Sequence, residues 1–273
     1  MKDGQYFCEN HPELMKLINL CDYSVLDVSL IALGTVFWIV VYVIIIRNSI
    51  KRQFVEMPVM AGLANIGWEF AWSFLITTDL GSIFVWGLRA WFLLDVFIFI
   101  QLMRYGGKQF GAAPLAQGHR WMSVFSLPCW VLAFYWFYQE GFDTTMGAGS
   151  AIFITVLMAG LYISLNLTRR TTRELSYTVA WCKGLGNAFM VTFILLHYEH
   201  SKLLALLGIV SIILDIVYIW IFAVRRKKEL SNPQLDVIPD GHIGTPLPPA
   251  VVAALKAADI PVKPNVETTS GDA

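Results

Sequence analysis

Seven apolar segments, each long enough to cross a lipid bilayer, dominate the sequence. An α-helix needs roughly 20 predominantly apolar residues to span the hydrocarbon core. The chain has seven such segments, which are Ser24 to Ile46, Met57 to Thr77, Ser82 to Met103, Trp121 to Gln139, Gly147 to Asn166, Val179 to His197 and Leu203 to Val224. Charged residues make up only 15% of the 273 residues, whereas a soluble domain carries about 25%. We therefore predict an all-α integral membrane protein with a bundle of seven transmembrane helices.

The connecting segments between these helices alternate in charge. Cytoplasmic loops of membrane proteins carry an excess of Lys and Arg. Basic residues gather in every second connection, at Arg47, Lys51, Arg52, Arg104, Lys108, Arg120, Arg169, Arg170, Arg173, Arg225, Arg226, Lys227 and Lys228. The other connections hold mostly acids, at Asp79, Glu140, Asp143 and Glu199, with a single Lys202. We therefore expect a non-cytoplasmic N-terminus and a cytoplasmic C-terminus.

Composition divides the chain into three parts. Residues 1–23 are predicted to be a non-cytoplasmic segment, which lacks the apolar core of a cleavable signal peptide. Residues 24–224 form the transmembrane domain, and residues 225–273, rich in Pro, Gly and Thr, are expected to be a disordered cytoplasmic tail. The host membrane would be the endoplasmic reticulum in a eukaryote or the cytoplasmic membrane in a bacterium. The sequence carries no indication of oligomeric state.

Charge and cysteine content limit the classes of partner. The formal net charge is zero, so nothing in the electrostatics favours binding to nucleic acid. The four cysteines show no CxxC spacing, which a metal site would often have. Cys8 and Cys21 both precede the first helix and could pair in an oxidising compartment. We therefore predict no metal site.

Five ionisable residues stand out deep inside the predicted spans, where charge is costly and usually functional. They are Glu69, Arg89, Asp95, Lys183 and Asp215. At a rise of 1.5 Å per residue, Glu69 lies ~3 Å to the outer side of its helix midpoint, and Asp215 and Asp95 lie ~2 Å and ~4 Å to the inner side. Three carboxyl groups therefore share a thin layer near the membrane midplane, which predicts a polar pocket. Each acid taken alone could instead join two helices through hydrogen bonds.

Helical spacing indicates which side chains share a face with these acids. Residues three or four apart lie on one face of a helix. This relation places Asn65 and Trp72 with Glu69, and places Trp91 with Asp95. Tyr218 shares a face with Asp215 in the same way, and Trp68 directly precedes Glu69. An apolar cavity lined by aromatic rings suits a hydrophobic ligand, and it also suits a carbocation, because ring faces attract cations.

The second predicted helix resembles a known family. The segment Asn65-Ile66-Gly67-Trp68-Glu69-Phe70 is similar to the N-I-A-W-E motif of the small seven-helix transmembrane terpene cyclases, the paspaline-type and meroterpenoid cyclases. Further similarities cover most of the chain to about residue 224, at Ala113-Pro114-Leu115, Ser176-Tyr177-Thr178, Lys183, Leu185-Gly186 and Leu214-Asp215 with Tyr218. The sequence departs from the family at Gly67, where Ala is usual, and at Trp72, where Tyr is common.

The resemblance implies a protonation-initiated, metal-independent cyclisation of a linear prenyl or meroterpenoid substrate, often an epoxide. It carries over Glu69 and Asp215 as the two catalytic acids. The residues expected to bind the hydrophobic prenylated substrate are Asn65, Trp68, Trp72, Arg89, Trp91, Asp95, Lys183 and Tyr218. An apolar site disfavours a charged carboxylate, so a buried acid can keep its proton and donate it to an epoxide or an alkene. Asp-rich metal-binding motifs are absent from the sequence, and no cofactor is expected.

Two other functions are compatible with seven helices and acids at the midplane. A small-solute transporter would use such acids, although the sequence shows no paired repeat halves. A retinal-binding protein would need a buried lysine on the seventh helix, and the segment Leu203 to Val224 has none. The cyclase interpretation therefore leads, with the transporter as the alternative.

Overall fold

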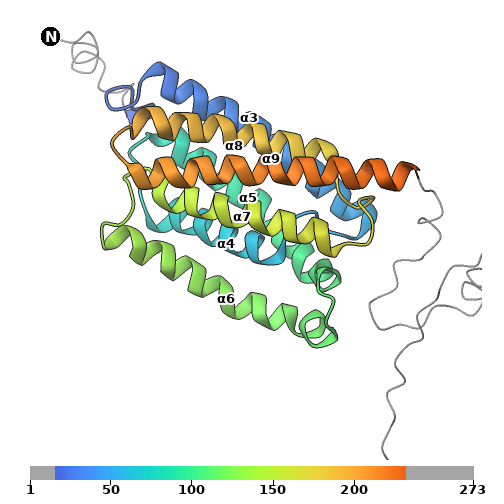
Figure 1. Ribbon diagram of the computed structural model, residues 1–273. Helices are drawn as coiled ribbons and strands as arrows, with labels where there is room; N and C mark the ends of the chain where they lie inside the picture. Colours follow the sequence, from blue (N-terminus) through green and yellow to red (C-terminus); the bar gives the residue numbers. More distant parts are fainter. Residues whose placement is uncertain (1–15, 232–273) are drawn as a thin grey trace, which may run out of the picture.

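The computed structural model describes residues 16–231, which form an all-helical bundle (Figure 1). With the labels of Figure 1, the α-helices are α3 (Val25–Arg52), α4 (Val59–Phe70), α5 (Ser82–Tyr105), α6 (Ala113–Gln139), α7 (Ala148–Thr168), α8 (Tyr177–His197) and α9 (Lys202–Ser231). A π-helix, η1 (Ala71–Leu75), continues α4, and a 3-10 helix, η2 (Gly106–Gln109), follows α5. Among the described residues, six helices are long and apolar enough to cross a membrane. The chain is therefore a multi-pass membrane protein.

The seventh helix is α4 together with η1. The α-helical part has 12 residues and the π-helical part has five more, which together give a length of about 25 Å. This is close to the thickness of the hydrocarbon core. The prediction of a seven-helix bundle is confirmed, and the orientation of its termini stays a prediction.

Three helices extend by six or more residues beyond the predicted spans, and the first is α3, which ends at Arg52 and not at Ile46. α6 begins at Ala113, before the predicted Trp121, because Pro114 in its first turn favours helix initiation. α9 continues to Ser231, so residues 225–231, which were assigned to the tail, are helical. Arg225 fixes this extension by donating to Asn166 Oδ1 at 2.8 Å. The rest of the predicted tail, residues 232–273, lies outside the described residues.

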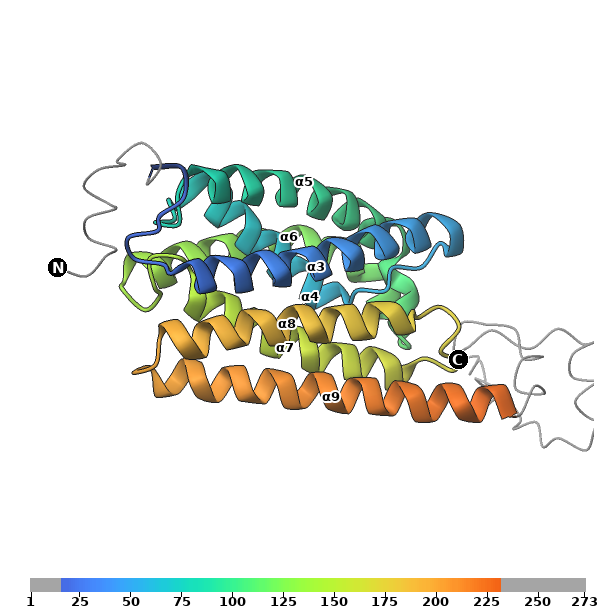
Figure 2. The same cartoon turned by 90° about the horizontal axis from the view of Figure 1, so that it is seen from above.

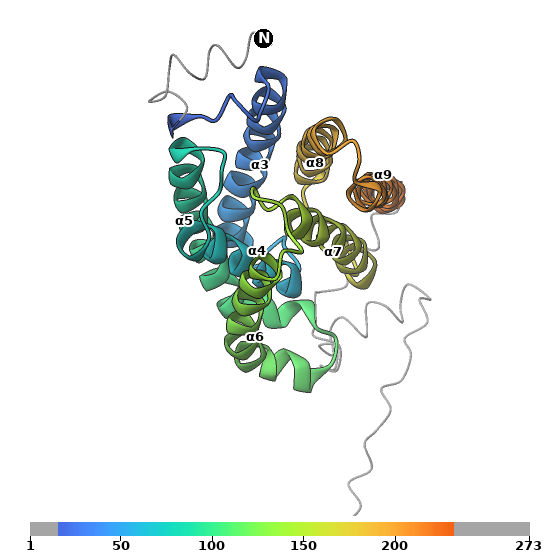
Figure 3. The same ribbon diagram turned by 90° about the vertical axis from the view of Figure 1, so that its left-hand side faces the viewer.

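The helices form two groups that meet along the axis of the bundle. α3, α8 and α9 lie side by side, with α7 packed on α9 (Figure 2). α4 lies near the centre and packs against α5, α6 and α7 (Figure 3). α3 and α5 belong to different groups and contact each other over a short stretch only. The space between the two groups holds the candidate site.

Glycines set how closely these helices approach. A Cβ atom built on Gly186 of α8 would lie 2.7 Å from Trp38 Cδ1 and 3.2 Å from the Gly34 carbonyl oxygen of α3. On α4, a Cβ atom on Gly67 would lie 2.7 Å from Trp130 Cβ of α6. The two 2.7 Å distances are shorter than van der Waals contact allows. The departure from the family pattern at Gly67 therefore follows from the close passage of α6.

The segment before α3 crosses the end of the bundle where α5 begins. Asn19 donates its backbone N–H to the Leu80 carbonyl at 3.0 Å, and the Tyr23 hydroxyl donates to Asp79 Oδ1 at 2.8 Å. Cys21 is disulfide-bonded, and Cys8 lies outside the described residues. These contacts tie the start of α3 to the start of α5.

Candidate active site

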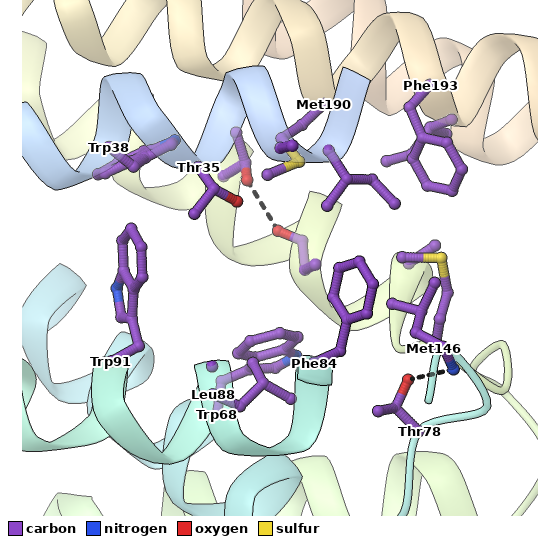
Figure 4. A pocket seen from close by; sticks show the side chains of 18 of the residues that line it. Thr35, Trp38, Trp68, Thr78, Phe84, Leu88, Trp91, Met146, Met190 and Phe193 are labelled. Carbon is purple, nitrogen blue, oxygen red and sulfur yellow. Dashed lines mark hydrogen bonds between the residues drawn. The ribbon is translucent and has the colours of Figure 1, made fainter. Parts of the chain in front are cut away.

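A cavity of about 660 Å³ lies between the two groups of helices and is lined by residues of α3, α4, α5, α7 and α8. This volume is in the range of small-molecule sites, which hold about 300–1,000 Å³. Aromatic and aliphatic side chains form most of its wall, and Trp38 of α3 and Trp91 of α5 point toward one another across it (Figure 4). The cavity therefore suits an apolar molecule.

Glu69 is the only Asp, Glu, Lys or Arg that lines this cavity within residues 16–231. Its side chain is buried, with 6% of the residue surface exposed, and Oε2 has no hydrogen-bond partner. A buried polar atom without a partner is rare in folded proteins and needs an explanation. Here the carboxyl group faces an apolar space in which a ligand could supply the missing partner.

A hydrogen-bonded cluster supports the wall beside Glu69. Asn65, one helical turn before Glu69, donates through Nδ2 to Asp95 Oδ2 at 2.7 Å and to the Tyr42 hydroxyl at 2.8 Å. Tyr42 donates to Asp95 Oδ1 at 2.8 Å. Asn65 and Tyr42 line the cavity, whereas Asp95 lies behind them. The cluster joins α3, α4 and α5 and so fixes the helix face that carries Glu69.

A π-helical turn follows Glu69 closely. Ile76 donates its backbone N–H to the Ala71 carbonyl at 2.8 Å, a bond of the i to i+5 type. π-turns are rare and occur frequently at functional sites, because they rotate the following residues relative to the preceding α-helix. No feature of the sequence indicates this turn, since the apolar pattern runs through it unbroken.

The second predicted acid lies outside the cavity. Asp215 of α9 forms a buried ion pair with Lys183 of α8, and it accepts a hydrogen bond from Asn187 Nδ2 at 2.7 Å. Asn187 Oδ1 in turn accepts from Trp38 Nε1 at 3.1 Å. Asn187 and Trp38 line the cavity, whereas Asp215 and Lys183 do not. Asp215 is therefore connected to the cavity through Asn187.

Lys183 is completely buried. Its ammonium group lies 5.1 Å from the ring centre of Tyr162 and 5.6 Å from that of Tyr218. Cation–π contacts and the ion pair together compensate its burial. Tyr218 therefore belongs to the environment of Lys183 and not to the cavity wall.

Comparison with known proteins identifies the family. Residues 20–228 match the family model of the Pyr4-like transmembrane terpene cyclases, which is well over half of the chain. The chain belongs to this family.

Curated relatives of this Pyr4-like cyclase are fungal proteins. It is 22% identical to the Pyr4-family terpene cyclase mfmH of Annulohypoxylon moriforme over 204 residues, which cover 70% of this chain and 83% of the relative. It is 26% identical to the terpene cyclase dpasB of Apiospora sacchari over 192 residues, 70% of this chain and 76% of that protein. No solved structure matches the chain. The chain is a membrane terpene cyclase.

Only some of the residues predicted to bind substrate line the cavity of this Pyr4-like cyclase. Asn65, Trp68 and Trp91 line the cavity with Glu69, and Trp68 Nε1 donates to Ser150 Oγ at 2.7 Å. Trp72 points away and packs against Tyr138 and Gly147. Arg89 donates through Nε to the Ser73 carbonyl at 3.2 Å and lies over the Trp86 ring. Neither Trp72 nor Arg89 lines the cavity.

Sequence reasoning missed several groups around the site. Tyr42 and Trp38 lie on the first predicted span, which has no ionisable residue near its middle that would indicate a site. Asn187 could have been found, because it follows Lys183 by four residues and so shares its helix face.

Glu56, just before α4, was also missed, because it lies outside the predicted spans. It is completely buried, and its Oε1 accepts from the Ser176 backbone N–H at 2.5 Å. Burial raises the pKa of the Glu56 carboxyl well above its ordinary value.

Proposed function

We propose that this chain cyclises a linear prenyl or meroterpenoid substrate by protonation inside the cavity, with Glu69 as the proton donor. The observation that carries the proposal is a buried carboxyl group with an unpartnered oxygen in a largely apolar, aromatic-lined cavity. Family membership supports the reaction class. No lysine or arginine within residues 16–231 lines the cavity, so its wall offers the carboxyl no cation that would favour the ionised form.

The proposed reaction conserves atoms. Glu69 transfers its proton to an epoxide oxygen or a terminal alkene carbon, which leaves a carbocation on the prenyl chain. Each ring closes as an alkene π-electron pair attacks the cation, and each closure moves the cation along the chain. Loss of a proton from the last cation forms an alkene, and the Glu69 carboxylate regains a proton. The product is therefore an isomer of the substrate. Each new ring consumes one carbon–carbon double bond when an alkene is protonated, and each ring after the first does so when an epoxide is opened.

Aromatic side chains are proposed to stabilise the cations. Trp38, Trp68 and Trp91 come from three different helices and line the same space. Ring faces attract cations without forming a bond to them. The apolar wall also limits the water that would quench the reaction early.

Asp215 is proposed to act as a positioning residue. Its carboxylate neutralises Lys183 and holds Asn187 by a hydrogen bond, and Asn187 holds the Trp38 indole. The family resemblance assigns an acid to this position. In this structure that acid reaches the cavity only through its neighbours.

We further propose that the substrate reaches the cavity sideways from the bilayer, between α3 and α5. Two residues that line the cavity are also exposed on the lipid-facing side, Val36 of α3 at 57% and Ile83 of α5 at 46%. Gly87 of α5 lines the cavity too, and a Cβ atom there would meet no atom within 4 Å. The Tyr42–Asp95 hydrogen bond joins the two helices further along the bundle. A prenyl chain dissolved in the membrane could therefore enter without crossing water.

The proposed reaction is tested with membranes that contain the full chain. They are incubated without added metal with farnesyl- and geranylgeranyl-substituted aromatic compounds, with and without terminal epoxides. The wild-type protein is expected to form isomers of unchanged mass. Glu69→Gln is expected to lower the rate by about 10²–10⁴-fold, the usual contribution of a general acid.

Glu56→Gln provides a matched control, because Glu56 is also a buried glutamate but does not line the cavity. It is expected to keep the wild-type rate. A folded Glu69→Gln protein that cyclises at the wild-type rate would refute the role of Glu69. If stably inserted wild-type protein converts none of these substrates, the transporter alternative would be tested by solute uptake.

A further inference from the structure

A second recess lies at the opposite end of the bundle from the start of α3. It has a volume of about 920 Å³ and shares no residue with the candidate active site. η2, the first turns of α6 and the connection from α7 to α8 form its walls. We call it the basic cleft, because of the residues described next.

Positive charge in the basic cleft greatly exceeds negative charge. The charged residues that line it are Arg104, Lys108, Arg120, Arg169, Arg170 and Glu174. The one carboxylate among them, Glu174, already forms an ion pair with Arg169. No acid that lines the cleft remains to neutralise the other four cations.

The other four cations differ in whether their side chains have a partner within the protein. Lys108 Nζ donates to the Gln53 carbonyl at 2.9 Å, and Arg120 Nε donates to the Met103 carbonyl at 2.9 Å. Within residues 16–231, the guanidinium groups of Arg104 and Arg170 make no hydrogen bond or ion pair, and both residues are exposed. Arg104 lies at the end of α5 and Arg170 just after α7, and both line the cleft. A guanidinium group offers a fixed set of donors that matches a phosphate group.

The position of the cleft along the bundle is compatible with a lipid ligand. It lies where the transmembrane helices α5 and α7 end, and Tyr105 and Phe110 contribute aromatic rings to its wall. α6 packs on α4 and hardly contacts α7, and Figure 3 shows α6 at the edge of the bundle. A molecule held at the cleft could therefore place apolar chains beside α6 in the bilayer.

We propose that the basic cleft binds the phosphate group of an anionic phospholipid, with Arg104 and Arg170 as its main ligands. Basic pockets between transmembrane helices are suited to such headgroups. Free phosphate carries the same recognition chemistry but no acyl chains, so the two sources are distinguished by experiment. The site is independent of the cyclase reaction, and its test needs no substrate.

The test uses the full-length protein in neutral detergent and follows thermal unfolding as phosphatidic acid is added. Phosphatidylcholine and inorganic phosphate are added in parallel at the same phosphate concentrations. Phosphatidic acid is expected to raise the unfolding midpoint more than either control. Arg104→Gln/Arg170→Gln is expected to weaken the apparent affinity roughly 30-fold, since each cation near an anionic headgroup changes it about fivefold.

Arg47→Gln/Lys51→Gln provides the matched control, because both residues are exposed at the end of α3 and neither lines the cleft. This variant is expected to bind phosphatidic acid like the wild-type protein. Equal effects of phosphatidic acid and phosphatidylcholine, or equal losses in both double variants, would overturn the proposal. Stabilisation by inorganic phosphate that matches phosphatidic acid would overturn the lipid assignment and leave a site for free phosphate.

Discussion

The ion pair between Lys183 and Asp215 allows the most demanding test of the site. Lys183 has no exposed surface, and the Asp215 side chain is only 3% exposed. Asp215→Asn preserves the shape and the oxygen that faces Asn187 but removes the negative charge. The buried ammonium group of Lys183 then has no counter-charge. Removing one partner of a buried pair costs about 3–5 kcal/mol of unfolding free energy, and we expect this range for Asp215→Asn.

The double variant Lys183→Met/Asp215→Asn removes both charges. Methionine fills a volume similar to that of lysine, and replacing a buried ion pair with well-packed neutral residues is often close to neutral. We therefore expect the double variant to return to within about 2 kcal/mol of the wild-type stability. Denaturant titration in detergent micelles, followed by circular dichroism, gives the unfolding free energies of the wild-type protein, the single variants Lys183→Met and Asp215→Asn, and the double variant. A double variant whose loss equals the sum of the two single losses would refute the pairing.

The same variants separate the proposed roles of the two acids. If Asp215 only positions its neighbours, the double variant should keep measurable cyclase activity while Glu69→Gln loses it. Asn187 still finds an amide oxygen at position 215 in the double variant, so its hold on Trp38 should survive. A double variant as stable as the wild-type protein and as inactive as Glu69→Gln would show that Asp215 itself takes part in proton transfer.

Three further predictions follow from packing and burial. Gly67→Ala should lower the unfolding free energy by about 1–3 kcal/mol, because its Cβ would lie 2.7 Å from Trp130 Cβ. Gly160→Ala, whose Cβ would meet no atom within 4 Å, should be neutral or slightly stabilising in the same denaturation assay. Gly87→Phe should raise KM for a membrane-dissolved substrate about tenfold while kcat changes little, because the added ring would narrow the proposed entrance. Gly160→Phe is the control. An unchanged KM in Gly87→Phe would contradict substrate access between α3 and α5. Because burial raises the pKa of the Glu56 carboxyl, the folded protein holds a proton that the unfolded chain releases. The unfolding free energy should therefore fall as pH rises above the ordinary carboxyl range, by at most about 1.4 kcal/mol per pH unit. Glu56→Gln should reduce this slope between pH 5 and pH 8, and an equal slope in both proteins would show that another group causes it.

Hydrophobic length and helical periodicity were sufficient to predict the architecture. Each span had to satisfy its own backbone inside the bilayer, so its apolar length predicts a helix without knowledge of its neighbours. The weakest prediction concerned helix ends. α6 and α9 extend into the connections at Ala113 and Ser231, because nothing stops a helix at the membrane surface when the next residues also favour helix.

Periodicity also placed Asn65 on the same face as Glu69, and this relation holds in the folded protein. Both residues line the cavity. Trp72, assigned to that face by the same rule, packs elsewhere, because the π-turn that begins at Ala71 changes the rotation of the helix between the two positions. The π-turn differs from an α-helical turn only in that its hydrogen bond spans five residues and not four. A backbone change this small leaves no trace in the hydrophobic pattern of the sequence.

The sequence by itself determined the seven helices, the family and four of the buried charged residues, Glu69, Asp95, Lys183 and Asp215. Only the tertiary structure decided which of these charges meet. Spacing within one helix fixes the relative direction of its own side chains, but the rotation of each helix about its axis depends on packing against its neighbours. Close approach at Gly34 and Gly186 places α8 against α3, which brings Asn187 to the cavity and leaves Lys183 to face Asp215. The two acids that looked equivalent along the chain therefore lie in different environments, one facing an apolar cavity and one paired with a buried cation.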